Sequence, residues 1–112
     1  MEKLVNYRNW IKQLLTAYAT TGSSDQKDVE DQLIFDLERD HYQLLSVGWA
    51  RGQRVYFCIL RLDIKNGKIW LQENSTDYDI IEDLMALGVP ASDVVIGFHP
   101  AEVRAMTEFA VA

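Results

Sequence analysis

Apolar residues recur at helical spacing along the start of the chain and predict one amphipathic helix over residues 2–20. The apolar positions are Leu4, Tyr7, Ile11, Leu14, Leu15 and Tyr18. Charged and amide side chains fall on the opposite side. Residues 20–28 are rich in Ser, Thr, Gly and Asp and have no apolar period, so we expect a mobile loop there.

Residues 32–74 show the alternation of β-strands, with three polar breaks. The first strand has one apolar face and one face that turns acidic toward its end. Its apolar residues are Leu33, Phe35 and Leu37, and the alternating residues are Ile34, Asp36 and Glu38. The second strand covers residues 42–50, and the third covers residues 54–64 after a tight turn at Arg51 and Gly52.

The third strand is apolar on both faces over most of its length. We therefore expect it to be central in the sheet and covered on both sides. One face carries Tyr56, Cys58, Leu60, Leu62 and Ile64, and the other carries Val55, Phe57 and Ile59 before it ends in Arg61 and Asp63.

Asn66 and Gly67 give the strongest local signal, because a type I′ turn needs positive φ at both central residues and this pair adopts it at low cost. A two-residue turn here fixes the register of the third and fourth strands. The predicted cross-strand pairs are Ile64 with Ile69, Leu62 with Leu71, Asp63 with Trp70, and Arg61 with Gln72. Four antiparallel strands in sequence order then form a meander.

Helical spacing returns over residues 78–87, with Asp77 or Asp79 as the N-cap and Gly88 as the C-cap. Residues 93–98 are compatible with either a short strand or a packed loop.

A short helix is expected to open near Ala101, and the uncharged apolar tail, residues 109–112, is expected to be docked. The predicted fold class is therefore α+β. It comprises an N-terminal helix, a four-stranded antiparallel meander, a second helix and a short C-terminal segment of strand and helix, in a single domain over residues 1–112.

The charge balance changes the picture of what this fold can bind. The chain has 17 Asp and Glu against 11 Lys and Arg in 112 residues, a formal net charge of −6. Because phosphate contacts supply much of the affinity for nucleic acid, this balance argues against direct binding of DNA or RNA. Neither an export signal nor a membrane span is visible, and the single cysteine, Cys58, lies in an apolar strand. We expect a cytoplasmic protein with no membrane partner and a buried thiol.

The acidic residues near the first hairpin allow two interpretations. Asp36 and Glu38 would point the same way on a strand, close to Asp40 and His41, and a divalent metal could bridge them. Charged residues also collect wherever a hairpin end meets solvent, and no second ligand cluster is present in the sequence. The solvated hairpin end is the simpler explanation.

Asp63 and Lys65 match the D-x-K fragment of many metal-dependent nucleases and, with Asp36, define the enzyme alternative. The neighbouring turn already accounts for polar residues at this place. His41 and His99 have no neighbours at zinc-binding spacing, and the glycines form no phosphate loop. We therefore predict no catalytic residue, no metal and no cofactor.

Two tryptophans suggest a surface for other proteins. Trp49 and Trp70 lie near the rim of the predicted sheet, opposite Arg54 and Asp63. Aromatic residues and arginine are enriched at protein interfaces, although a place in the core is the favoured interpretation for both tryptophans. The C-terminal segment adds further candidate contact residues, namely His99, Arg104 and Phe109.

Three stretches carry a resemblance to a known family. They are QLIFDLERDHYQLLSVGW, CILRLDIKNGKIWLQ and GFHPAEVRAMTEFAVA. In these stretches, and in uninterrupted order over residues 1–112, the chain resembles the XisI family, the excision controlling factors of the cyanobacterial fdxN element. The resemblance implies an XisI-like domain with no defined catalytic residue.

The same resemblance implies a regulatory role in a programmed DNA rearrangement during heterocyst development. XisI-like proteins act there with an XisH-like partner, while a separate site-specific recombinase, with which the association would be indirect, cuts and rejoins the DNA. A homo-oligomer, a small nuclease using Asp63 and Lys65, and a direct DNA-binding accessory protein stay open as alternatives.

Overall fold

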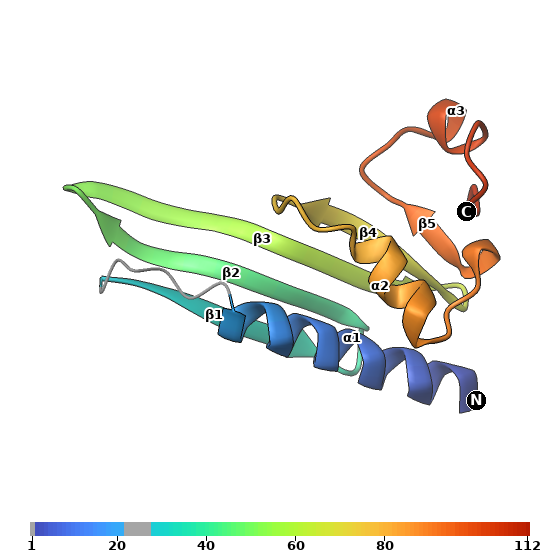
Figure 1. Ribbon diagram of the computed structural model, residues 1–112, viewed down its shortest axis with the longest axis horizontal. Helices are drawn as coiled ribbons and strands as arrows, with labels where there is room; N and C mark the ends of the chain where they lie inside the picture. Colours follow the sequence, from blue (N-terminus) through green and yellow to red (C-terminus); the bar gives the residue numbers. More distant parts are fainter. Residues whose placement is uncertain (1, 22–27) are drawn as a thin grey trace.

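The computed structural model describes residues 2–21 and 28–112 and shows a layer of helices over one face of a five-stranded sheet (Figure 1). The elements are α1 (Glu2–Thr21), β1 (Val29–Asp36), β2 (His41–Ala50), β3 (Gln53–Lys65), β4 (Lys68–Asn74), α2 (Ile80–Leu87), the 3₁₀ turn η1 (Ala91–Asp93), β5 (Val94–Ile96) and α3 (Ala101–Arg104). Strands β1 to β4 form the predicted antiparallel meander, and β5 joins β4 in parallel. The predicted α+β class is confirmed.

The predicted amphipathic helix forms α1, which buries its apolar stripe against the sheet. Ile11 and Leu15 are fully buried, and the hydrophilic side faces solvent. The predicted loop over residues 20–28 lies mostly outside the described residues, and α1 itself continues to Thr21. No helix in the described part of the chain is long and apolar enough to span a membrane.

A single apolar cluster lies between the helices and the sheet. Its members from the sheet are Tyr42, Leu44, Leu60, Leu62, Ile64, Ile69, Leu71 and Val94, and those from the helical side include Tyr7, Ile11, Leu14, Leu15, Ile80 and Leu84. Burial of each large apolar side chain stabilises the fold by roughly 1.5–3 kcal/mol relative to exposure. Helices α1 and α2 therefore cover one face of the sheet, whereas Arg104 of α3 lies near Trp70 on the other face.

Polar contacts at the ends and sides of α1 fix its position on the sheet. The Tyr7 hydroxyl donates to Asp93, with the oxygens 2.5 Å apart, and Arg8 Nε lies 2.8 Å from Asp40 Oδ1. The Tyr18 hydroxyl donates to Asp83 of α2. Burial, together with this hydrogen bond, raises the pKa of Tyr18 to about 12.

The type I′ turn at Asn66 and Gly67 is confirmed, with φ values of 55° and 74°. Three of the four predicted pairs around it are observed. The pairing of Arg61 with Gln72 is wrong, because a bulge shifts the register and Arg61 faces Glu73 instead.

Strand β3 is central, as predicted, but two other expectations about it are wrong. Leu60 pairs with Leu44, and Cys58 pairs with the next residue of β2, Leu45. Ile59 is therefore an extra residue in β3 at a bulge. Because consecutive residues of β2 point to opposite faces, Cys58 lies on the face opposite Leu60. The strand is also uncovered at its start, where Tyr56 is 67% exposed.

The C-terminal elements settle the alternatives left open by the sequence. Asp79 is the N-cap of α2, since its side chain accepts the amide N–H of Glu82, and Gly88 is the C-cap. Within residues 93–98, Val94–Ile96 form the short strand β5, and α3 begins at Ala101 as predicted. The tail is docked, because the Ala110 N–H donates to the Val94 carbonyl at 2.8 Å.

Candidate interaction surface

Helices α1 and α2 leave the other side of the sheet uncovered, and we call this side the open face. Strand register assigns to it His41, Gln43, Leu45, Val47 and Trp49 of β2, Arg54, Tyr56, Cys58, Arg61 and Asp63 of β3, and Trp70 of β4. The bulge residue Gln72 has no register partner, but its hydrogen bond to Asp63 places it on the same face. An antiparallel sheet tolerates such a half-solvated face, because polar and amphipathic residues alternate with the core positions. This face holds the densest group of polar contacts between strands.

Asp63 is the centre of that polar group. Its side chain is almost fully buried, and its Oδ1 lies 3.0 Å from His41 Nδ1 and 3.2 Å from Arg61 Nε. Its Oδ2 accepts the Gln72 amide at 3.2 Å. A buried carboxylate needs such donors to offset its desolvation. The three donors come from three adjacent strands, so the group ties β2, β3 and β4 together.

Trp70 lies beside this group with cations near its ring. Lys65 Nζ is 4.7 Å and the Arg104 guanidinium carbon 5.3 Å from the ring centre, both within reach of a cation–π interaction. Arg104 is itself fixed by backbone carbonyls of His99 and Val111, each at 2.6 Å. Trp70 is only 8% exposed, and its indole N–H has no partner among the described residues.

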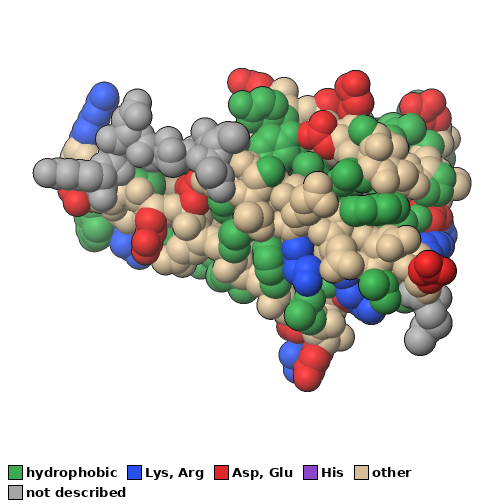
Figure 2. All heavy atoms as spheres, turned by 60° about the horizontal axis from the view of Figure 1, so that its bottom comes forward, with side chains coloured by type: hydrophobic (Ala, Val, Ile, Leu, Met, Phe, Trp, Pro, Cys, Tyr) green, Lys and Arg blue, Asp and Glu red, His purple; other side chains and the backbone are tan. Residues whose placement is uncertain are grey.

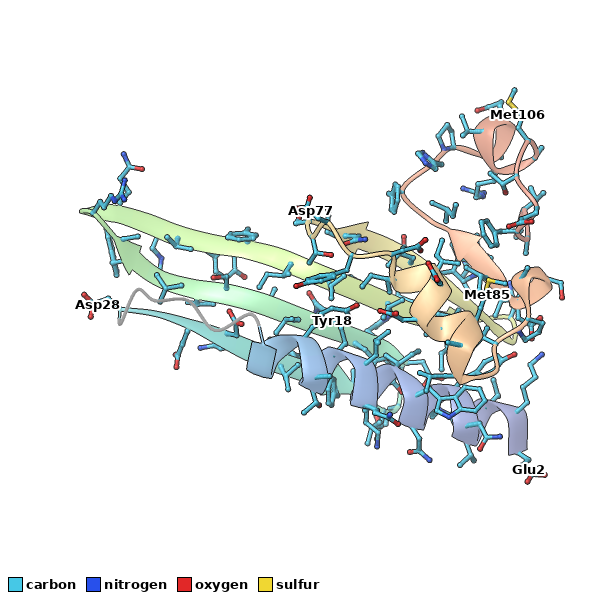
Figure 3. All side chains as sticks on the ribbon, viewed as in Figure 1. Glu2, Tyr18, Asp28, Asp77, Met85 and Met106 are labelled. Carbon is cyan, nitrogen blue, oxygen red and sulfur yellow. The ribbon has the colours of Figure 1, made fainter. Side chains whose placement is uncertain are left out.

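Trp49 and Arg54 lie at the other end of the open face, near the tip of the β2–β3 hairpin. They are register partners, and the guanidinium carbon of Arg54 is 5.6 Å from the indole ring. Trp49 is 54% exposed. Arg54 and Asp63 are nine positions apart on β3, about 30 Å along a strand. Figure 3 places Asp28 at this end of the molecule and Met106 at the opposite end.

The structure brings together some of the predicted surface residues and separates others. Asp63, Trp70 and Arg104 are neighbours, whereas Trp49 and Arg54 form a second, distant group. The remaining two predicted residues are His99, whose ring contacts Phe98, and Phe109, which packs against the core.

Sequence reasoning missed His41, Arg61 and Gln72 as partners of Asp63. The pairing of His41 with Asp63 follows from the meander once the register of β2 and β3 is known, so strand alternation could have found it. Gln72 is different, because its position depends on a bulge that the sequence does not signal.

The proposed strand geometry of the acidic group near the first hairpin is wrong. β1 ends at Asp36, and Glu38 lies in the following turn, where Asp36 accepts the amide N–H groups of Glu38 and Arg39. These hydrogen bonds, that from the Arg39 amide foremost, lower the pKa of Asp36. Asp40 instead accepts from Arg8 and Tyr42. The described residues contain no group of three or more His, Cys, Asp or Glu side chains placed to hold a metal ion.

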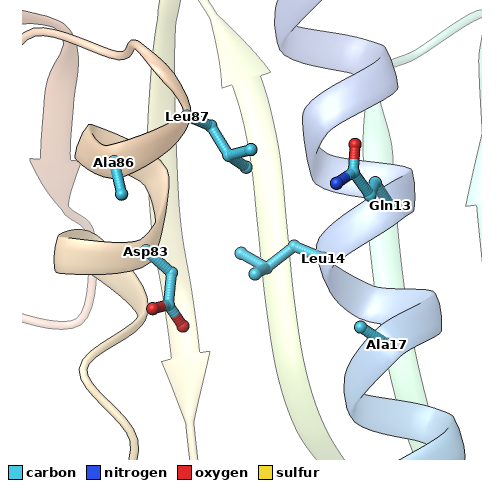
Figure 4. A pocket seen from close by; sticks show the side chains of 6 residues that line it. All are labelled: Gln13, Leu14, Ala17, Asp83, Ala86 and Leu87. Carbon is cyan, nitrogen blue, oxygen red and sulfur yellow. The ribbon is translucent and has the colours of Figure 1, made fainter.

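A pocket of about 260 Å³ lies between α1 and α2 (Figure 4). Its lining residues are Gln13, Leu14 and Ala17 from α1 and Asp83, Ala86 and Leu87 from α2. Asp83 already accepts the Tyr18 hydroxyl, so the pocket offers a mainly apolar wall and one engaged carboxylate.

Comparison with known proteins identifies the family. The family model described as XisI protein matches residues 1–111. The chain belongs to the XisI family. None of the curated proteins matches it.

Two solved structures have the same XisI architecture. An XisI-like protein from Anabaena variabilis ATCC 29413 is 47% identical, with 97% of this chain and 99% of that chain covered and a TM-score of 0.92. The fdxN element excision controlling factor XisI from the same organism is 41% identical, with 98% and 99% covered and a TM-score of 0.87. The meander, its helical layer and the C-terminal elements are therefore the XisI fold.

Proposed function

We propose that this chain is a non-enzymatic controlling factor that acts by binding proteins during the excision of a DNA element. The observation that carries the proposal is Trp49, a large aromatic side chain that stays 54% exposed on the open face with Arg54 beside it. Tryptophan and arginine dominate the residues that carry binding energy at interfaces. Membership of the XisI family, with a 41% identical relative named as an excision controlling factor, supports the process.

The partner we propose is an XisH-like protein in the cytoplasm, with a site-specific recombinase reached only through it. The net charge of −6 supports a basic, DNA-handling partner rather than DNA itself, because complementary charge speeds association and selects partners. The second part of the proposed surface is the C-terminal segment with Arg104. The process we propose is an excision event of the fdxN type during heterocyst development.

Co-purification with the XisH-like protein tests the surface. We expect Trp49→Ala to reduce recovery of the partner by about tenfold or more, as for a central interface aromatic. Tyr78→Ala is the matched control, because Tyr78 is 59% exposed and its ring contacts Tyr18 of α1, on the helical side of the sheet. Trp70 is less suitable for this test, since its ring is almost fully buried. Equal recovery with Trp49→Ala would count against this surface.

Incubation of the purified protein with plasmid and Mg²⁺ or Mn²⁺ tests the absence of catalysis. We expect intact plasmid, because the Asp63 carboxylate is engaged by three side chains and Lys65 lies over Trp70. Cleavage that disappears in Asp63→Ala would establish a nuclease and contradict the proposal. A salt-sensitive gel shift by the isolated protein would instead establish direct DNA binding.

A further inference from the structure

Strand β1 is an outer strand of the sheet, and its outer side has no pairing partner in the described part of the chain (Figure 1). The opposite edge is different, because Ala110 bridges the outer side of β5. Natural proteins protect long edges with proline, a bulge or charged side chains, lysine above all. The eight residues of β1, VEDQLIFD, contain no proline, glycine or lysine and pair with β2 in continuous register.

The ladder determines which backbone groups of β1 face outward. The Trp49 N–H donates to the Asp28 carbonyl at 3.0 Å, and the two positions are opposite each other in the register that continues along β1. In an antiparallel pair, hydrogen-bonded positions alternate with positions whose amides point away. The N–H and C=O groups that point away from β2 therefore belong to Val29, Asp31, Leu33 and Phe35.

The charge of this edge indicates what it can pair with. β1 contains three acidic residues, Glu30, Asp31 and Asp36, and no basic residue. An added strand with lysine or arginine side chains would face these carboxylates at cross-strand distance, which stabilises a ladder. The net charge of −6 also attracts a basic segment over longer range.

A second copy of the chain fits the same edge poorly. In antiparallel pairing, the outward-bonding positions of one strand must face those of the other, so the two-fold axis between the strands must lie level with a residue. An axis at Leu33 places Glu30 opposite Asp36 of the second copy, and an axis at Gln32 places Asp28 opposite Asp36. These two registers pair the largest part of β1, and each puts like charges directly opposite each other twice, which is destabilising.

We propose that β1 takes up an extended, lysine- or arginine-rich segment of a partner protein as a sixth strand. The proposal rests on the proposed function in one respect, that the chain acts by binding a protein. Backbone hydrogen bonds at Val29, Asp31, Leu33 and Phe35 supply the pairing. Leu33 on the helical side is 38% exposed and Ile34 on the open face 44%, so each offers an apolar contact to the added strand.

A synthetic peptide of sequence Lys-Val-Lys-Thr-Lys-Val-Lys is the probe, with amide chemical shifts of the full chain as the readout. We expect the largest shifts at the outward amides of β1 and an affinity that falls as salt is added. The same peptide with glutamate in place of lysine should not bind. Shifts confined to the neighbourhood of Trp49 or Asp63 would overturn the proposal.

Leu33→Pro and Leu33→Thr form the matched pair of variants. Proline at this position removes an outward N–H and leaves the ladder to β2 intact, so peptide affinity should fall about tenfold or more. Threonine retains the N–H and should bind within about twofold of the original chain. Equal binding by both variants would overturn the proposal.

Two charge-reversal variants test the proposal even if Leu33→Pro does not fold. Glu30→Lys reverses one charge on β1, whereas Glu102→Lys makes the same change on α3. We expect the first to weaken peptide binding and the second to leave it unchanged. Sedimentation that shows a dimer dissociated by Leu33→Pro would assign the edge to a second copy and overturn the proposal. Loss of peptide binding with continued capture of the XisH-like protein through Trp49 would reject the edge and leave the proposed function standing.

Discussion

At the scale of single residues, aspartates in this molecule act mainly as acceptors that hold elements together. Asp93 accepts from Tyr7, Asp63 from residues of three strands, and Asp40 from Arg8 and Tyr42. These carboxylates therefore stabilise the fold as hydrogen-bond acceptors and also contribute negative charge.

The Asp40 carboxylate provides a pH-dependent prediction. Its hydrogen bonds from Arg8, then those from Tyr42, lower the pKa of Asp40 in the folded state. A lowered folded pKa means that the stabilisation is complete above the unfolded value and is lost as pH falls through the folded pKa. We expect Asp40→Asn to lower the free energy of unfolding by about 1 kcal/mol at pH 7. The difference from the original chain should shrink below about pH 4.

Urea denaturation at a series of pH values measures this difference. Asp77→Asn is the control, because Asp77 is an exposed carboxylate in the loop before α2 and should not change stability. A difference between Asp40→Asn and the original chain that stays constant down to pH 2 would contradict the assignment.

At the scale of elements, the sequence predicted what depends on local pattern and failed where tertiary contacts decide. Turn chemistry and strand alternation are local, so they predicted the Asn66–Gly67 turn, the caps of α2 and the order of the four antiparallel strands. The bulges at Ile59 and Gln72 were not, since one extra residue in a strand leaves the composition of the strand unchanged. The faces assigned to Tyr56 and Cys58 were wrong for that reason.

Tertiary contacts also decide which of the predicted surface residues are exposed. Trp49 and Trp70 each lie in a strand opposite a charged residue, yet one is exposed at the hairpin tip and the other is buried beneath Lys65 and Arg104. The position of Arg104 depends on how the C-terminal segment folds back. Residues distant in sequence therefore decide the exposure of Trp70.

Gly48 gives a prediction at the element scale that the sequence did not suggest. Its φ is 154°, and a Cβ atom there would lie 2.0 Å from the Asp28 carbonyl oxygen, so the start of β1 packs directly on it. We expect Gly48→Ala to lower stability by more than about 2 kcal/mol, because backbone must move. Gly52→Ala, where the added atom meets nothing within 4 Å and only the φ of 76° is strained, should cost about 1 kcal/mol. Equal losses in urea denaturation would contradict the close packing.

At the scale of the whole molecule, the sheet is longer than the helical layer that covers it. The principal extents are 43 × 31 × 24 Å, and the β2–β3 hairpin projects beyond α1 (Figure 1). Figure 2 shows charged side chains of both signs, separated by hydrophobic ones, on the side it presents. The radius of gyration of 14.8 Å exceeds the roughly 13 Å expected for a compact chain of this length.

Removal of the last four residues tests the role of the C-terminal segment. A variant ending at Glu108 loses the packing of Phe109 and the bridge between Ala110 and Val95. We expect a stability loss of about 2 kcal/mol and self-association through the uncovered edge of β5. Phe109→Ala separates the two effects, since it should lose stability and remain monomeric in light scattering. A truncated chain that stays monomeric would contradict the protective role of Ala110.

The length of β3 has a consequence for the thermodynamics of binding. Its end near Asp63 is held by core packing and by side chains from both neighbouring strands, whereas its start near Arg54 projects with little cover. Segments with few buried contacts open at low free-energy cost, so we expect the hairpin tip to open more readily than the end near Asp63. A partner that binds Trp49 must therefore order backbone as it binds, and calorimetry should record an entropic cost. A partner that binds beside Asp63 meets a surface whose conformation is already set.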